Sequence, residues 1–187
     1  MLRFLIFLQF LLFSGCSFSD TNDVEKPKLV VAVVVDQMRY DYLTRLSSKF
    51  SDDGFNRLVN QGFNCLDNHF NYVPTVTGPG HTSIATGSTP SVHGIVGNEW
   101  YDRKNKAELY CATDLNYENI GGNAYYGKKS PNNMLANSFA DQNRIYNKMK
   151  SKSIAISIKD RGAIFMVGKN ANASYWFYGK DKGEWIT

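Results

Sequence analysis

The apolar residues of this chain fall into short runs separated by segments rich in glycine, asparagine and serine. Residues 29–35 form a continuous, mostly β-branched run, which is typical of a parallel strand buried on both faces. Residues 153–158 predict a second parallel strand. Further strands are predicted at residues 63–72, at 109–113 and, as a hairpin, at 175–178 and 184–187.

Helices are predicted between these strands. Residues 41–48 and 55–61 predict short helices, and a third is expected at 162–168. Residues 137–150 predict a longer helix that packs on the sheet and forms the crossover between parallel strands. The apolar residues at nearly helical spacing that indicate it are Leu135, Phe139, Ile145 and Met149. With loops expected at 91–101 and 114–131, the predicted fold is one α/β domain, a mostly parallel sheet flanked by helices.

Residues 74–87 predict a strand end, a tight turn and a short helix. Pro79 suits the first helical position and Gly87 the residue after the last turn. Thr77 then precedes the helix, where free backbone N–H groups and the positive end of the helix dipole favour an anion. A threonine here commonly serves as a helix N-cap. Its hydroxyl is also placed to attack a phosphoryl or sulfuryl group, so both interpretations stay open.

Charged residues follow two of the predicted strands. Asp36 ends the run 29–35, and Lys159 and Arg161 follow 153–158. Ligands of open α/β sheets bind outside the carboxyl ends of the strands. Taken singly, Asp36 is also compatible with a helix cap, and the two cations are compatible with a solvated surface pair. Taken with Thr77, they are the parts of a phosphoryl-transfer site: a hydroxyl, a carboxylate that holds a metal ion, and cationic donors.

Composition narrows the class of protein. With 187 residues, 43% of them hydrophobic and 20% charged, the chain is long enough for one globular domain. The net charge is only +4, without an arginine-rich run, so a nucleic-acid partner is not expected. Cys65 and Cys111 are compatible with one disulfide, but the sequence does not supply the distance between them. The sequence does not define an oligomeric state.

The N-terminus predicts export. Arg3 precedes an apolar stretch that is too short to span a membrane, and small residues lead to Cys16. Residues 1–16 resemble a bacterial lipoprotein signal, in which Cys16 would be lipidated, and 17–28 would be a polar tether. Phe13 stands where such signals usually have leucine, so ordinary cleavage is the alternative. The expected location is the periplasm, either free or anchored to the membrane through Cys16.

Four motifs, in this order, resemble the alkaline phosphatase superfamily, and within it the phosphate-irrepressible alkaline phosphatases that are related to type I phosphodiesterases/nucleotide pyrophosphatases. They are V-V-V-D-Q-M-R with Asp36, T-V-T-G-P-G-H-T-S-I-A-T-G with Thr77, G-N-E-W-Y-D with Asn98, and I-K-D-R-G-A-I with Lys159 and Arg161. The resemblance covers residues 29–187.

The resemblance implies an activity and a role for each motif residue. Thr77 would be the nucleophile and form a phosphothreonine, and Asp36 and Thr77 would ligate one zinc of a two-zinc site. Asn98, Lys159 and Arg161 would contact the non-bridging oxygens. Two cations suit the extra negative charge of a phosphate monoester, so zinc-dependent hydrolysis of small phosphate monoesters is the expected function.

One departure from the family pattern affects this expectation. The family's remaining zinc ligands, aspartates and histidines, come from a half that these residues do not include. The histidines here, His69, His81 and His93, show no metal-ligand spacing and are expected to be loop or packing residues. We therefore expect residues 29–187 to be the N-terminal part of a longer catalytic domain. The alternatives are phosphodiesterase or nucleotide pyrophosphatase activity, and a catalytically inactive truncated remnant.

Overall fold

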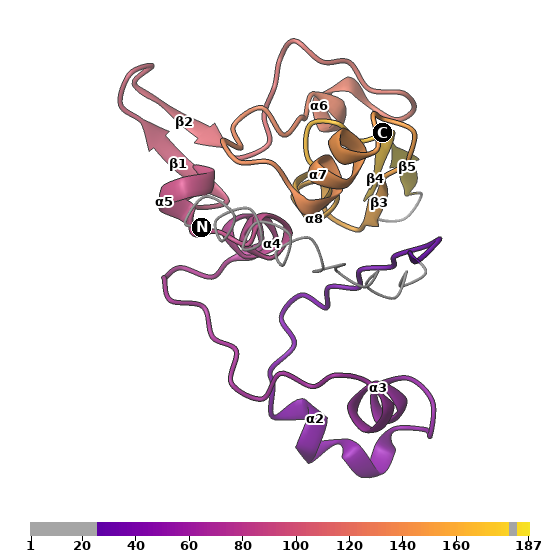
Figure 1. Ribbon diagram of the computed structural model, residues 1–187. Coiled ribbons are helices and arrows are strands. Elements are labelled where there is room, and N and C mark those ends of the chain that lie inside the picture. Colours follow the sequence, from indigo (N-terminus) through magenta and orange to yellow (C-terminus); the bar gives the residue numbers. More distant parts are fainter. Residues whose placement is uncertain (1–25, 180–182) are drawn as a thin grey trace, which may run out of the picture. The chain divides into compact units, whose positions relative to one another are not determined.

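The computed structural model describes residues 26–179 and 183–187 (Figure 1). The proposed signal, with Cys16, and most of the proposed tether lie outside the described residues. The chain divides into two units, Met1–Val33 and Val34–Thr187. In the part of the chain that is described, no helix combines the length and the apolar character needed to cross a bilayer.

The strand predicted at residues 29–35 does not form, so that prediction is wrong. The backbone there is irregular, and Leu29, Val31 and Val33 are each more than two thirds exposed, at 78%, 71% and 79%. A strand buried on both faces needs a hydrogen-bonded neighbour and a covering layer on each side. None of the described strands pairs with this segment. The strand predicted at 63–72 is also absent, and that segment is irregular.

A three-stranded sheet forms the C-terminal part of the second unit, in the order β3-β4-β5. β3 (Ile154–Ser157) runs parallel to β4 (Ala173–Tyr178), and β4 pairs antiparallel with β5 (Glu184–Ile186). The second predicted strand and the C-terminal hairpin are thus confirmed, as is the α/β class. The parallel partner of β3 is the later strand β4 rather than an earlier one. The crossover is therefore α8 (Asp160–Val167) and not the helix before β3.

A separate hairpin is formed by residues 99–110 of the second unit. β1 (Glu99–Asp102) pairs antiparallel with β2 (Ala107–Tyr110), and Glu99 lies opposite Tyr110. The expectation of a loop over 91–101 is therefore wrong in part, because β1 and the short helix α5 (Pro90–His93) occupy much of it. The predicted strand 109–113 is displaced towards the N-terminus. The expected loop 114–131 contains one helical turn, α6 (Ala124–Gly127).

The early helices follow the glycine signals closely. The predicted helix 41–48 is split into α2 (Tyr42–Arg45) and the 3₁₀ helix η1 (Ser47–Lys49). α3 (Phe55–Gln61) has the predicted bounds, between Gly54 and Gly62. No residue of these three helices is buried.

α7 (Phe139–Tyr146) is shorter than predicted and buries a different face. Ser138 and Asp141 form a capping box at its start, and Ala140, Asp141 and Arg144 are its buried residues. Asp141 also accepts hydrogen bonds from the backbone and side chain of Asn170. The spaced apolar residues that were expected to face the sheet are instead exposed, namely Leu135, Phe139, Ile145 and Met149. The face of α7 that carries the capping carboxylate is thus the buried one, and the apolar stripe faces outwards.

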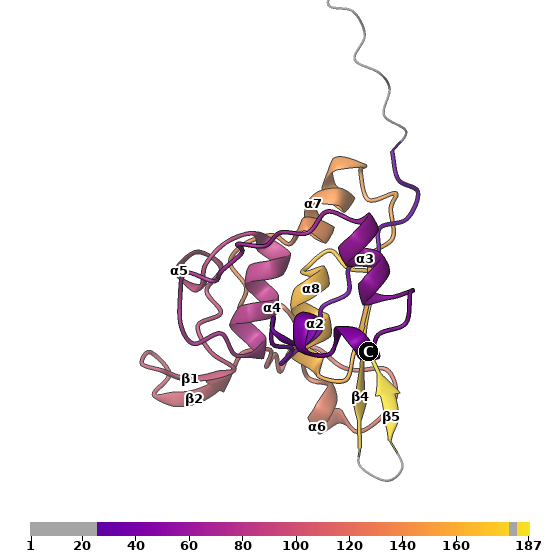
Figure 2. The ribbon, with the colours of Figure 1, turned by 90° about the horizontal axis from the view of Figure 1, so that it is seen from below.

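α4 (Thr77–Thr86) and α8 pack side by side (Figures 1 and 2). α8 also covers β3 and β4, so it connects α4 to the sheet. A Cβ atom on Gly162 of α8 would lie 2.6 Å from Ser157 Oγ and 3.8 Å from His81 Nε2 of α4. The absence of a side chain at residue 162 therefore permits the close approach of α8 to Ser157 of β3, while a Cβ would meet His81 only at ordinary contact distance. The buried apolar cluster contains Ile95, Cys111, Ala112, Met134, Ile164, Phe165, Trp176 and Ile186.

The contribution of the capping box of α7 to stability can be tested by mutation. Replacing Ser138 with alanine should lower the free energy of unfolding by about 1–2 kcal/mol, because the N-cap hydroxyl that binds the Asp141 backbone is lost. Urea unfolding of the 187-residue chain measures this. Thr89→Ala is the matched control: Thr89 occupies the N-cap position of α5 without making a side-chain cap bond, so its loss should matter less. Equal losses in the two variants would contradict the assignment.

Candidate active site

Thr77 begins α4, and its hydroxyl does not cap the helix. Val76, in extended conformation, holds the N-cap position without a side-chain cap bond. Thr77 Oγ instead donates to Asp36 Oδ2 at 3.1 Å. Thr77 was expected to precede the helix and Pro79 to begin it; both expectations are wrong by two residues, because the first turn starts at Thr77. The interpretation of Thr77 as an N-cap is also wrong, while Gly87 ends the helix with φ of 64°, as predicted.

Asp36 is held for this contact by a sharp turn. The next residue, Gln37, has φ of 59°, a conformation that costs a residue with a side chain about 1–2 kcal/mol. The turn lets the Gln37 N–H donate to Asp36 Oδ1 at 3.0 Å, while Oδ2 accepts from Thr77. Asp36 therefore caps no helix; the residue before α2 is Asp41. Backbone strain of this kind is often found at functional sites.

Asn98 lies beside the start of α4. Its Oδ1 accepts from the Gly78 N–H at 2.7 Å, which leaves the amide NH₂ as a donor. A Cβ atom on Gly78 would lie 3.1 Å from Asn98 Oδ1 and 3.1 Å from Gly97 O, so only glycine allows this contact without displacement. Three predicted site residues, Asp36, Thr77 and Asn98, are thus joined through the first turn of α4.

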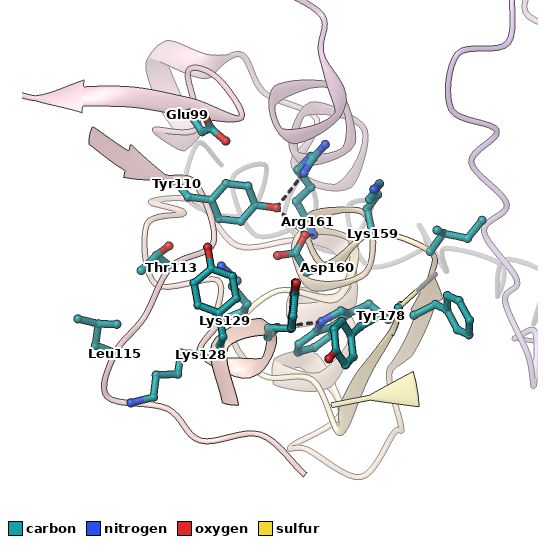
Figure 3. Close-up of a pocket in the computed structure, with 16 residues that line it drawn as sticks. Glu99, Tyr110, Thr113, Leu115, Lys128, Lys129, Lys159, Asp160, Arg161 and Tyr178 are labelled. Carbon is teal, nitrogen blue, oxygen red and sulfur yellow. Dashed lines mark hydrogen bonds between the residues drawn. The ribbon is translucent and has the colours of Figure 1, made fainter. Parts of the chain in front are cut away.

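Arg161 is fixed by two residues that the sequence reasoning did not identify. Arg161 Nη1 donates to the Tyr110 hydroxyl at 2.9 Å, and that hydroxyl donates to Asp160 Oδ1 at 2.5 Å (Figure 3). Burial, together with the charge of Asp160, raises the pKa of Tyr110, so its hydroxyl stays protonated. Burial alone would lower the pKa of Arg161, but the hydrogen bond to Tyr110 and the charge of Asp160 outweigh it, and the pKa of Arg161 is raised. Asp160 lies in the Lys-Asp-Arg motif, whereas no local signal marked Tyr110.

The β1–β2 hairpin connects the residues around Thr77 to the residues around Arg161. The backbone N–H of Cys111 donates to Asn98 O at 2.9 Å, directly beside Tyr110. Contacts therefore run from Gly78 through Asn98 to Tyr110 and Arg161. Lys159 precedes α8, and its side chain is exposed. Lys159 and Arg161 also line a cavity of about 620 Å³. Thr77, Asp36 and Asn98 are not among the residues that line it.

Comparison with known proteins defines the family. The family model for type I phosphodiesterase / nucleotide pyrophosphatase matches residues 30–184. The chain belongs to this family. Alkaline phosphatase PafA of Elizabethkingia meningoseptica is 45% identical over 158 residues, which are 84% of this chain and 29% of that protein. Alkaline phosphatase PhoV of Synechococcus elongatus is 44% identical over 154 residues, 82% of this chain and 28% of PhoV.

A third relative carries another name. A protein of Myroides odoratus named calcium-transporting ATPase is 46% identical over 167 residues, 89% of this chain and 30% of that protein. The crystal structure of wild-type alkaline phosphatase PafA matches with a TM-score of 0.84 and 43% identity, over 88% of this chain and 32% of that one. The chain thus spans about 30% of the length of the relatives it matches. The expected alkaline phosphatase fold is confirmed, in part of its length.

The described residues of this family member do not complete a zinc site. A catalytic zinc normally takes three protein ligands and a water. Among residues 26–179 and 183–187, no group of three His, Cys, Asp or Glu side chains is placed to hold a metal ion. The oxygens of Asp36 and Thr77 are two adjacent donors and so fit only part of a ligand set.

The histidines and cysteines of the chain have other surroundings. His81 Nδ1 donates to Thr77 O at 2.9 Å, and buried His93 bonds to Ser83 through Nε2. Burial lowers the pKa of His93, so this ring is neutral. Cys65 is exposed and Cys111 buried, and the two are not joined in a disulfide. Burial raises the pKa of the Cys111 thiol to about 12, which makes it unreactive.

The contact between Gly78 and Asn98 can be tested within one helix. Gly78→Ala should displace Asn98 and its neighbour Gly97, so it should gain less stability than Gly80→Ala. At Gly80 a Cβ would meet only Thr75 O, at 3.5 Å, and the helix should gain up to about 1 kcal/mol from alanine. Urea unfolding of both variants gives the comparison. A Gly78→Ala variant as stable as Gly80→Ala would show that Asn98 moves freely.

Proposed function

We propose that this chain is the nucleophile-bearing part of a phosphate monoesterase, with Thr77 as the nucleophile and a phosphothreonine as the intermediate. The observation that carries the proposal is the hydroxyl of Thr77, which caps no helix and is bonded to Asp36. The hydroxyl lies at the positive end of the helix dipole, which favours an incoming anion, although the Gly78 N–H already donates to Asn98 and Pro79 has no N–H. Asp36 accepts the Thr77 hydrogen bond and so orients the oxygen that attacks.

The reaction has two displacements. In the first, Thr77 Oγ gives up its proton to solvent and forms a bond to phosphorus, while the ester oxygen leaves with the bonding electrons and takes up a proton. In the second, a water oxygen gives up a proton and attacks the phosphothreonine, and Thr77 Oγ leaves with the bonding electrons and is protonated again, which releases inorganic phosphate. Asn98, Lys159 and Arg161 would bind the non-bridging oxygens; the Asn98 amide would donate a hydrogen bond, and the two cations would offset the negative charge in both transition states.

An unpartnered donor supports the role of Arg161. Its Nε is buried and has no hydrogen-bond partner among the described residues, while Nη1 is held by Tyr110. A buried donor without a partner is unfavourable, and a phosphoryl oxygen would satisfy it. Because Tyr110 and Asp160 fix the guanidinium, little side-chain freedom is lost when the anion binds.

A variant of the same relative supports the choice of residues. One crystal structure is of a PafA variant in which a threonine is changed to serine, and an asparagine, a lysine and an arginine to alanine; its TM-score is 0.79 at 40% identity. The threonine and the asparagine are as far apart in that sequence as Thr77 and Asn98 are here. The lysine and the arginine are two positions apart, as are Lys159 and Arg161. The four residue types and their order match those of this chain.

The family resemblance supports a proposal of zinc dependence. We propose that Asp36 and Thr77 supply two ligands of one zinc ion in a two-zinc site, and that the other ligands lie outside the described residues. This accords with the chain spanning about 30% of the length of its relatives. When bound, zinc would favour the ionised form of the Thr77 hydroxyl. In this proposal residues 29–187 are the N-terminal part of a catalytic domain. Residues 1–16 are an export signal with Cys16 as the lipidated anchor, and 17–28 are a tether.

Two alternatives remain in competition. The family description includes phosphodiesterases and nucleotide pyrophosphatases. A monoester offers three non-bridging oxygens and a diester two, so the pair Lys159 and Arg161 favours the monoester. The other alternative is an inactive remnant, which the incomplete ligand set among the described residues favours.

The nucleophile can be tested in a chimera. Residues 30–184 would replace the matching segment of Elizabethkingia meningoseptica PafA, and release of p-nitrophenol from p-nitrophenyl phosphate would be followed. Thr77→Ala should lower kcat by at least about 10³-fold, because the attacking oxygen is removed. Thr77→Ser should keep part of the activity, and Thr86→Ala, in the last turn of the same helix, most of it.

The chimera also separates the alternatives. Full turnover by the Thr77→Ala chimera would refute the nucleophile. A folded chimera that is inactive even with zinc supplied would favour the remnant.

The substrate class depends on Lys159. In the active chimera, Lys159→Ala should lower kcat/KM for p-nitrophenyl phosphate by about 10²-fold, because one donor to the developing charge is lost. It should lower kcat/KM for bis-p-nitrophenyl phosphate much less, since the diester has one charged oxygen fewer. Lys152→Ala, an exposed lysine before β3, is the control. Equal losses for both esters would favour the diesterase.

A further inference from the structure

The cavity beside Arg161 is larger than a phosphoryl group requires. Its volume of about 620 Å³ lies in the range of sites that bind organic molecules. One end carries Lys159 and Arg161, which the proposed function assigns to the phosphoryl oxygens (Figure 3). The rest of the cavity has no role in that proposal.

Aromatic rings form the wall of the cavity away from these cations. Trp176 and Tyr178 are alternate residues of β4 and so lie on the same face of the sheet. Tyr126, from α6, stacks on Tyr178, with ring centroids 3.9 Å apart and planes inclined by 30°. Tyr125 meets Tyr126 edge to face. The wall thus consists of rings from two separate segments of the chain.

The wall is held in place before a ligand arrives. Trp176 is 5% exposed and belongs to the buried apolar cluster, so its ring is fixed by packing. Its Nε1 donates to the carbonyl oxygen of Tyr126 at 3.2 Å, which ties α6 to β4. Because the wall is already ordered, little binding free energy is lost in fixing its side chains when a ring stacks on it.

Tyr110 connects the wall to the cations. Its hydroxyl binds Arg161, and its ring forms part of the cavity lining, with Lys129 Nζ 4.3 Å from the ring centroid. Four cations line the cavity, Lys128, Lys129, Lys159 and Arg161, against two acids, Glu99 and Asp160. The cavity is thus suited to a ligand that is anionic at one end and flat and apolar at the other.

We infer that this cavity binds the leaving group of the substrate, and that the substrate is a phosphate monoester whose leaving group contains a planar aromatic ring. The phosphoryl group lies at Lys159 and Arg161, and the ring stacks on the outer face of the Tyr126–Tyr178 pair. This inference rests on the proposed function for the place of the phosphoryl group. The aromatic site itself is a property of the described chain.

The test is a titration of the 187-residue chain with ligands that are not cleaved. Phenylphosphonate carries an anion and a ring, and methylphosphonate the anion alone. The indole N–H signal of Trp176, assigned with a Trp176→Phe variant, reports on the wall in two-dimensional ¹⁵N NMR, and those of Trp100 and Trp185 are internal references. Phenylphosphonate should shift the Trp176 signal in a saturable way, and methylphosphonate should not.

Variants define the binding surface. Tyr126→Leu and Tyr178→Leu should each weaken the affinity for phenylphosphonate by about tenfold, since the stacked ring is lost. Tyr117→Leu, at an exposed tyrosine outside the cavity, should leave it unchanged. Circular dichroism confirms that each variant is folded. Adenosine 5′-monophosphate, on a Thr77→Ala background, tests a ring held further from the phosphate. A response to either aromatic ligand supports the site. The ligand that binds more tightly shows which distance between ring and phosphate the cavity fits.

Two outcomes would overturn the inference. One is a Trp176 signal that neither aromatic ligand shifts. The other is an affinity for phenylphosphonate that Tyr126→Leu and Tyr178→Leu leave unchanged. These results are independent of turnover, so failure of the site and failure of the proposed function are distinguishable. An inactive chimera together with ring-dependent binding would refute the function and keep the aromatic site; an active chimera without such binding would do the reverse.

Discussion

The close packing of α4 on α8 is the constraint on which the site depends. Thr77 begins one helix, and Lys159 and Arg161 lie at the start of the other, so the distance between the helices sets the distance between hydroxyl and cations. Gly162 lets α8 lie close to β3, because a Cβ there would be 2.6 Å from Ser157 Oγ, whereas at 3.8 Å it would only touch His81 of α4. His81 in turn donates to the carbonyl oxygen of Thr77, so a residue of the helix contact is bonded directly to the residue that bears the hydroxyl. Packing and site are therefore not separable in this part of the chain.

Hydrogen bonds to buried polar groups stabilise segments that lie outside the sheets. Asp114 accepts hydrogen bonds from the side chains of Ser130 and Asn132 and from the backbone of Asn116, which closes the long segment that carries the aromatic residues. Burial alone would raise the pKa of Asp114, but these hydrogen bonds outweigh it, and its pKa is lowered. The carboxylate thus stays ionised and keeps accepting at neutral pH. The hydrogen-bonded carboxylate of Asp114 therefore helps to fix the backbone of a segment that is rich in tyrosine, glycine and asparagine.

Local signals in the sequence predicted what local interactions determine. Glycine punctuation gave α3 and the end of α4 correctly, and four spaced motifs gave the family and the α/β fold. The errors arose where a pattern needs a partner. An apolar run such as 29–35 shows that a segment is able to be buried, but not what would cover it.

Tyr110 was missed for a related reason. Its place beside Arg161 depends on the register of the β1–β2 hairpin and on a contact across more than 50 positions, and no short motif encodes either.

The protonation states of Arg161 and Tyr110 are constant at neutral pH, whereas that of Thr77 has to change in the reaction. The pKa of Arg161 and that of Tyr110 are both raised, so the guanidinium keeps its charge and the phenol its proton throughout the neutral range. Asp160 Oδ1 receives the phenolic hydrogen bond and one from the Arg161 backbone N–H, but none from the guanidinium, which leaves the guanidinium Nε for another acceptor. A cation held by a neutral hydroxyl retains more of its field than one paired directly with a carboxylate. The described chain thus supplies a constant positive field and one oriented hydroxyl, so the proton on Thr77 is the variable that any chemistry here must control.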